Sequence, residues 1–238
     1  MADDLSEIKE RLDYAEGEIS AVRKEVAEYV AGRPIESRQK LVGSLLHCQM
    51  RISVPIPTAI RARTGGAIHE MRSCLDALTC RLAERNNQNT KQVYFPISKN
   101  ADIFKTDGMR KIAKLSDADR QVIVELAPFA EADPFLFGMH EFDRTKKHNR
   151  LGLSAIGQAR MMFHWPQTSI RNGVTMMHGA LINADWVTVL TMHPNDRIGL
   201  GFHYHVAFEE PEQLKGLEIT EAMGRLMVQV RGIVSRFD

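Results

Sequence analysis

Apolar side chains recur every three or four residues through residues 3–31. This spacing is the a/d pattern of an amphipathic helix, and it continues for four heptads with Glu and Lys on the flanks. Gly32 and Pro34 follow and end the predicted helix. Two uses of this apolar stripe are open: packing inside a helical bundle, or association with a second copy of the chain. The stripe comprises Leu5, Ile8, Leu12, Ala15, Ile19, Val22, Val26 and Tyr29.

A second periodic segment, GGAIHEMRSCLDALTCRL over residues 65–82, carries apolar and polar positions on one helix. His69, Arg72 and Asp76 recur at i, i+3 and i+7, so they share a face beside the apolar stripe. Arg72 and Asp76 are four residues apart, and as a pair each keeps its charge at lower cost when buried. This pattern is typical of a helix inside a bundle, and we expect the rest of the chain to pack around it.

The remaining segments of the first 150 residues also have mainly helical patterns. Residues 54–58 hold two prolines, which predict an extended crossing into the helix at 65–82. The short apolar segment 93–97 is expected to close one end of the bundle. Ser116 and Asp133 stand where N-caps are needed. The additional predicted helices cover residues 35–52, 108–115, 116–129 and 133–150.

After Leu151 the apolar positions change from a helical period to a period of two. Short β-branched segments separated by Gly, Pro, Asn and Asp predict four or five antiparallel strands between about residues 151 and 208. A final amphipathic helix over 219–237 should lie on this sheet. The sequence therefore predicts an α+β fold, with a helical bundle at 1–150 and an antiparallel sheet with a closing amphipathic helix at 151–238.

Composition is that of an ordinary soluble protein, with 44% apolar and 26% charged residues. The net charge of +1 indicates neither nucleic acid nor a membrane surface, so only a local patch could do so. Three cysteines without a CxxC pair favour reduced thiols and a cytoplasmic protein. The acidic N-terminus is not a signal peptide, and no apolar run reaches membrane-spanning length, so we expect no membrane partner.

Three motifs resemble a widespread family of uncharacterised bacterial proteins. They are GGAIHEMRSCLDAL at residues 65–78, Phe-Pro-Ile at 95–97, and a helix end Lys-Lys-His-Asn at 146–149. The helical half is also similar to the HEPN superfamily of nucleotide-binding and RNA-cleaving bundles, whose arginine-to-histidine motif would run from Arg144 to His148. The resemblance implies a HEPN-like bundle acting as a ribonuclease or toxin-type effector, as in phage defence or a stress response.

Metal-independent RNA cleavage needs a base, an acid and cations for the phosphorane. His148 can be base or acid, because an ordinary imidazole titrates near neutral pH. Arg144 or Arg72 can hold a phosphate bidentately. If the two helices pack face to face, these groups meet in one polar cleft, with no cofactor implied. The predicted catalytic residues are His148, Arg144, Arg72, Asp76 and His69, and the predicted nucleic-acid contacts are Lys146, Lys147 and Arg150.

Other interpretations stay open. Arg72, Asp76 and His148 could form a buried structural network instead of a site. His203 and His205 have the spacing of a metal pair on a strand, although no carboxylate or cysteine spacing completes a recognised metal set. The second function class is a non-catalytic oligomeric module for binding or assembly. In either class we expect a homodimer through helical surfaces, and RNA is the candidate partner of the first.

Overall fold

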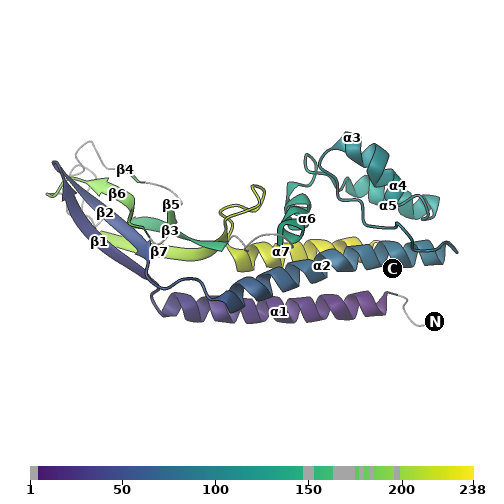
Figure 1. Cartoon of the computed structure of the whole chain (residues 1–238), viewed down its shortest axis with the longest axis horizontal. Coiled ribbons are helices and arrows are strands. Elements are labelled where there is room, and N and C mark those ends of the chain that lie inside the picture. Colours follow the sequence, from purple (N-terminus) through teal and green to yellow (C-terminus); the bar gives the residue numbers. More distant parts are fainter. Residues whose placement is uncertain (1–4, 147–152, 163–174, 177–179, 183–184, 196–198) are drawn as a thin grey trace.

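The computed structural model describes residues 5–146, 153–162, 175–176, 180–182, 185–195 and 199–238. A rod of three long helices carries two small sheets at one end, while shorter helices lie over the rod toward its other end (Figure 1). The named strands pair antiparallel. The predicted α+β class is confirmed.

The rod consists of α1 (Ser6–Ala31), α2 (Thr58–Arg85) and α7 (Ile219–Ser235). Every position of the apolar stripe predicted at 3–31 is buried. Apolar side chains of α2 and α7 belong to the same core, because each helix presents a stripe of three- and four-residue spacing to the other two. The helix at 65–82 therefore lies within a bundle, as predicted, and the stripe at 3–31 has the first of its two open uses, packing within the chain.

Ion pairs join the rod helices at their edges. Arg11 of α1 lies 2.5 Å from Glu70 of α2, and Arg231 of α7 lies 2.6 Å from Asp13 of α1. Between these edges the apolar stripe of α1 packs against helices of its own chain. The stripe is thus used within one chain, and the homodimer stays a prediction that this stripe no longer supports.

Residues 35–52 form a β-hairpin, so the helix predicted there is wrong. β1 (Ile35–Val42) and β2 (Leu45–Ile52) pair antiparallel around a two-residue turn. Gly43 in this turn has a φ of +62°, which glycine adopts without a Cβ clash. In β2 the buried Cys48 and Met50 are separated by the half-buried Gln49, which is the period of a strand, whereas β1 is exposed after Ile35. The overlooked signal is the Gly-Ser pair at 43–44, which stands between the apolar pairs at 41–42 and 45–46.

β2 continues the pairing to β6 (Val187–Met192), and β6 pairs with β4 (Thr175–Met176), so the first sheet has the order β1-β2-β6-β4. The second sheet has the order β5-β3-β7, formed by β5 (Ala180–Ile182), β3 (Leu153–Met162) and β7 (Gly199–Phe208). The antiparallel strands predicted after Leu151 are confirmed within the described residues. The first sheet buries one face in a core of Cys48, Met50, Val189, Leu190 and Met192.

α7 lies along α1 and α2, not flat on a sheet as predicted (Figure 1). The second sheet meets this helix at its N-cap, where Ala207 of β7 forms a bridge with Glu218. The difference has a physical reason. An amphipathic pattern identifies which face of a helix is buried, whereas the partner of that face is decided by the other elements. Here α1 and α2 offer a long apolar surface that matches the length of α7.

The chain between α2 and α6 folds over the rod. An irregular helix is formed by α3 (Ala101–Ile103), the π-helical turn η1 (Phe104–Gly108) and α4 (Met109–Lys111). α5 (Asp117–Leu126) and α6 (Pro134–Lys146) follow. The predicted N-caps of α5 and α6 are confirmed, since the side chains of Ser116 and Asp133 each accept a backbone N–H three residues later.

The apolar segment 93–97 packs against the rod, with Val93, Phe95 and Ile97 all buried. Its backbone thereby reaches the polar face of α2, where it accepts and donates hydrogen bonds. Among the described helices, none combines the length and the apolar character that crossing a membrane requires.

Candidate functional site

The candidate site lies where α6 contacts α2. Four polar side chains follow one face of α2 at positions i, i+3, i+4 and i+7, and α6 brings His140 and Asp143 against them. The contacts separate into two groups, a buried one around Arg72 and a more open one around His69. The four side chains on α2 are those of His69, Arg72, Ser73 and Asp76.

Arg72 is buried and joins three separate parts of the chain. Its Nη1 lies 2.6 Å from Oδ1 of Asp76; this nitrogen makes no hydrogen bond in the described structure, so the contact is an ion pair. Nη2 donates to the backbone oxygen of Phe95 at 3.1 Å, and Nε donates to Nδ1 of His140 at 3.3 Å. The predicted Arg72–Asp76 pair is confirmed. We call these four residues the Arg72 network.

The carboxylate of Asp76, the partner of Arg72, also has a hydrogen bond from the backbone. Oδ1 of Asp76 accepts the backbone N–H of Phe95 at 2.8 Å, so Phe95 both accepts from Arg72 and donates to Asp76. This reciprocal pattern fixes the segment 93–97 on α2. An arginine with its guanidinium held in this way is a structural group, because a phosphate would have to replace contacts that already exist.

His140 is held in its neutral form by the Arg72 network. Burial, as the larger cause, and the positive charge of Arg72 act in the same direction and lower the pKa of its imidazole to about 4. A neutral Nδ1 can accept the Nε–H of Arg72, whereas a protonated one would oppose it. The network therefore requires an unprotonated imidazole.

This requirement predicts that the fold becomes less stable in mild acid. The pKa of His140 is about 4 in the folded chain against 6.5 for an unperturbed group, so the unfolded chain binds the extra proton between these values. The stabilisation is complete above pH 6.5 and is lost as the pH falls toward 4, by up to about 3 kcal/mol. Urea unfolding at about pH 7 and about pH 4.5 measures this loss. A His140→Gln variant should lose less than the wild type, and His47→Gln on the sheet is the control. Equal losses in wild type and His140→Gln would contradict the assignment.

His69 and Asp143 form the second group, which we call the His69 pair. Nδ1 of His69 lies 2.8 Å from Oδ1 of Asp143, whose side chain is buried. An ionised carboxylate only accepts, so the proton of a neutral His69 stands on Nδ1 and Nε2 is left as the acceptor. The His69 side chain is 47% exposed, so Nε2 can be reached from solvent. Ser73 Oγ is 3.5 Å from Nε2, at the outer limit of a hydrogen bond.

Such a pair can transfer a proton. The carboxylate holds the imidazole in one tautomer and orientation, which is the function of the third member in hydrolytic triads. Three residues in the order Ser73, His69 and Asp143 also match the sequence of contacts in a triad. However, Ser73 lies on the same helix one turn away, and its Oγ is at the outer limit of a hydrogen bond to Nε2. Proton transfer to or from a bound ligand is the chemistry that this geometry supports best.

The other predicted site residues are distributed as follows. Arg144 follows Asp143 on α6, is exposed, and forms an ion pair of 2.6 Å with Glu141. Lys146 is the last residue of α6. Three further predicted residues lie outside the described residues: Lys147, His148 and Arg150. The predicted residues His69, Arg72 and Asp76 thus share one face of α2, and Arg144 directly follows Asp143 on the adjacent α6.

The predicted strand histidines lie on β7, far along the chain from the His69 pair. His203 pairs with Gln158 and His205 with Ile156 of β3. His205 is half-buried. In the described part of the chain no three His, Cys, Asp or Glu side chains gather closely enough to hold a metal ion.

None of the three cysteines forms a disulfide, and none is activated as a nucleophile. Burial raises the pKa of the Cys74 thiol to about 11, and it raises the pKa of Cys48 and Cys80 as well. A thiolate is therefore not available at neutral pH at these positions.

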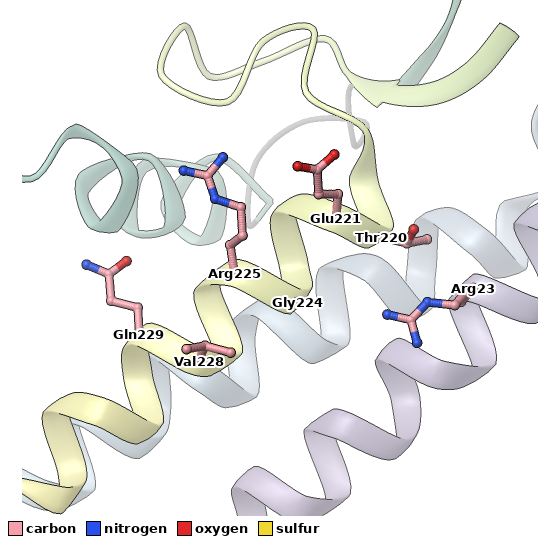
Figure 2. Close-up of a pocket in the computed structure, with 7 residues that line it drawn as sticks. All are labelled: Arg23, Thr220, Glu221, Gly224, Arg225, Val228 and Gln229. Carbon is pink, nitrogen blue, oxygen red and sulfur yellow. The ribbon is translucent and has the colours of Figure 1, made fainter. Parts of the chain in front are cut away.

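A shallow hollow lies between α7 and α1 near the start of α7 (Figure 2). Gly224 contributes no side chain to it, and Val228 beside it is 73% exposed. Arg225 stacks its guanidinium 4.6 Å from the ring centre of Phe135. The residues lining the hollow include no histidine or cysteine, so it offers no group for proton transfer near neutral pH.

Sequence reasoning missed His140 and Asp143, which the structure places opposite α2. Their spacing of three residues put them on one face of a predicted helix, and that helix already carried Arg144. Matching the polar face of this helix to the polar face of α2 could have found them. No pattern in the sequence predicts the contact of Phe95 with Arg72, which depends on the backbone of a loop.

Comparisons of the chain with known protein families, with curated proteins and with solved structures found no match.

Proposed function

We propose that this protein cleaves RNA without a metal ion, with His69 moving the proton and Asp143 orienting it. The observation that carries the proposal is the His69 pair: a half-exposed imidazole whose Nδ1 lies 2.8 Å from a buried carboxylate on another helix. Keeping a carboxylate buried beside an imidazole costs free energy, which a purely structural surface contact does not need. The HEPN-like resemblance of the helical half points to the same reaction class.

The proposed step follows from the free position of Nε2. Nε2 takes the proton of a ribose 2′-hydroxyl, and the 2′-oxygen attacks the adjacent phosphorus. The bond from phosphorus to the 5′-oxygen then breaks, and that oxygen takes a proton from an acid. The products are a 2′,3′-cyclic phosphate and a 5′-hydroxyl, so atoms and charges balance without an oxidant or a metal. His148, predicted from the sequence as base or acid, is proposed as this acid.

Cations for the phosphorane are proposed to come from Arg144 and from the basic residues that follow it. Arg144 is exposed and directly follows Asp143 on α6, and its partner Glu141 is half-buried. A surface ion pair of this kind contributes little free energy, so a phosphate can compete for the guanidinium. Lys146, Lys147 and Arg150 extend the cationic stretch in the sequence.

The proposal revises the functions expected for Arg72 and Asp76. In it, both residues position the segment 93–97 and α6 and do not contact RNA, because the Arg72 network occupies their polar atoms. A toxin-type effector acting on RNA would work in the cytoplasm, where the free thiols of the chain remain reduced.

The test is cleavage of a 5′-labelled single-stranded RNA by the purified protein in the presence of EDTA. We expect cleavage to survive EDTA, to leave cyclic phosphate ends, and to weaken steeply as salt is raised. A His69→Ala variant purified in parallel controls for contaminating nucleases. No cleavage by the wild type, or cleavage only with added metal ions, would contradict the proposal.

A non-catalytic binding or assembly module is the second candidate, and one observation favours it. The polar atoms of Arg72, Asp76 and His140 are directed at one another and at Phe95, which is how a structural network is built. RNA that binds but stays intact with the wild-type protein would support this function over cleavage.

A further inference from the structure

One face of the first sheet is rich in cationic and planar side chains that the proposed cleavage reaction does not use. Because side chains alternate along strands, the same face of β1 and β2 carries every second residue. Met50 and Cys48 point to the buried core, so the intervening residues lie on the open face. The open face of the two strands carries Glu36, Arg38, Lys40, His47, Gln49 and Arg51.

Trp186, directly before β6, adds a large aromatic ring to this face. The guanidinium carbon of Arg38 lies 4.0 Å from the centre of a Trp186 ring, and that of Arg51 lies 4.7 Å away. Arg38 also donates to Gln49 at 2.9 Å, and Arg51 to Glu36 at 2.8 Å. These contacts hold two guanidinium groups and an indole in fixed positions on the sheet.

The face is accessible. Arg38 and Lys40 are exposed, and Arg51, Gln49 and Trp186 are half-buried. On β1 and β2 this face carries three permanent cations and the carboxylate of Glu36, while the whole chain has a net charge of only +1. The positive charge is therefore a local property of this face.

We propose that this face binds single-stranded nucleic acid. Alternate residues of a strand are about 6.8 Å apart, so Arg38 and Lys40 lie at a spacing close to that of successive phosphates in an extended single strand. Bases stack on aromatic rings and on guanidinium planes, and this sheet offers both side by side. Gln49 and Thr188, joined at 3.2 Å, add neutral hydrogen-bonding groups next to them.

An acidic protein surface could also approach a cationic sheet, but it would not use the planar groups. Phosphates alone would be satisfied by cations on flexible side chains. The stacked arrangement of Arg38, Trp186 and Arg51 favours a ligand with both phosphates and flat bases. The inference goes beyond RNA cleavage, because it concerns a different surface and stands whether or not the protein is a nuclease.

The experiment measures binding of a labelled dT12 oligonucleotide by fluorescence anisotropy. This DNA has no 2′-hydroxyl and cannot undergo the proposed cleavage, so a failure of binding is distinguishable from a failure of catalysis. The variant is Arg38→Ala with Lys40→Ala, and the matched control is Arg23→Ala with Lys24→Ala on α1, which removes the same charge from exposed positions.

We expect the dissociation constant of the sheet variant to rise at least about tenfold while the control changes less than about twofold. In a Trp165→Phe background, Trp186 is the one remaining tryptophan, and its fluorescence should be quenched by bound dT12. Preference for dT12 over a duplex of equal length is also expected. No binding by the wild type, equal losses in both double variants, or equal affinity for an acidic peptide would overturn the inference.

Discussion

Replacing Arg72 with alanine is expected to lower the free energy of unfolding by roughly 3 to 5 kcal/mol. The substitution removes the ion pair to Asp76 and the hydrogen bonds to Phe95 and His140 in one step. It leaves the carboxylate of Asp76 two-thirds buried, with the hydrogen bond from the backbone N–H of Phe95 as its remaining contact in the network. Because the same contacts fix the segment 93–97 and α6, the loss should be felt across the interface of both with α2.

Chemical unfolding of the wild type and the variant measures this effect. Arg81→Ala is the matched control: Arg81 is also on α2 and forms ion pairs with Glu84 and Glu7, but its side chain is 42% exposed. A surface pair of this kind should cost less than about 1 kcal/mol. Arg72→Lys should be intermediate, since one ammonium cannot reproduce a fork that reaches three partners. If Arg72→Ala costs no more than Arg81→Ala, the buried network does not stabilise the fold.

The helices of the rod could be predicted because their information is local. The apolar stripe of α1 and the faces of α2 need only the helical period, and Gly32 with Pro34 marks the end of α1. The position of α7 could not be predicted from local information alone, because its apolar stripe fits either a sheet or a pair of helices. That choice is made by the long surface between α1 and α2, which no single segment encodes.

The hairpin at 35–52 shows how a short apolar run misleads. Its leucines, Val42 and Met50 fit a helical spacing when taken alone, whereas His47, Gln49 and Arg51 alternate with Cys48 and Met50 at a period of two. β2 is also paired with β6, more than a hundred residues later, and that pairing supplies the partner strand. Tertiary pairing of this kind overrides local helix propensity.

The contacts of the candidate site also divide into local ones, which the sequence predicts, and long-range ones, which it does not. Arg72 and Asp76 are four residues apart, so their pairing follows from the helix itself. His69 was identified from its place on the same face, but its partner Asp143 is separated from it by 74 positions. The sequence therefore yields the face and not the contact across it. This explains why the proton-transfer group was predicted at His148 and is proposed at His69.

The largest expected effect on activity belongs to the His69 pair. If the protein cleaves RNA as proposed, His69→Ala should lower the cleavage rate by about 10²- to 10⁴-fold, because the group that accepts the proton is gone. Added imidazole should restore part of the rate, since a free base can enter the space of the removed ring. A purely structural histidine would show no such rescue. Arg23→Ala, at an exposed position of α1 outside both the site and the open sheet face, should keep the wild-type rate.

Asp143→Asn provides the sharper test. It preserves the shape of the side chain, but it removes the negative charge and replaces a group that only accepts hydrogen bonds with one that can also donate. The amide can donate to Nδ1 of His69, which would place the imidazole proton on Nε2, the wrong nitrogen for a base. We expect a loss of about 10²-fold or more in rate, together with a changed pH–rate profile and a melting temperature close to that of the wild type.

Ser73→Ala should have a much smaller effect, since its Oγ is only at the outer limit of contact with Nε2. Equal cleavage by wild type, His69→Ala and Asp143→Asn would remove this pair from the mechanism, and a His148→Ala variant would then decide whether the originally predicted histidine supplies the proton transfer.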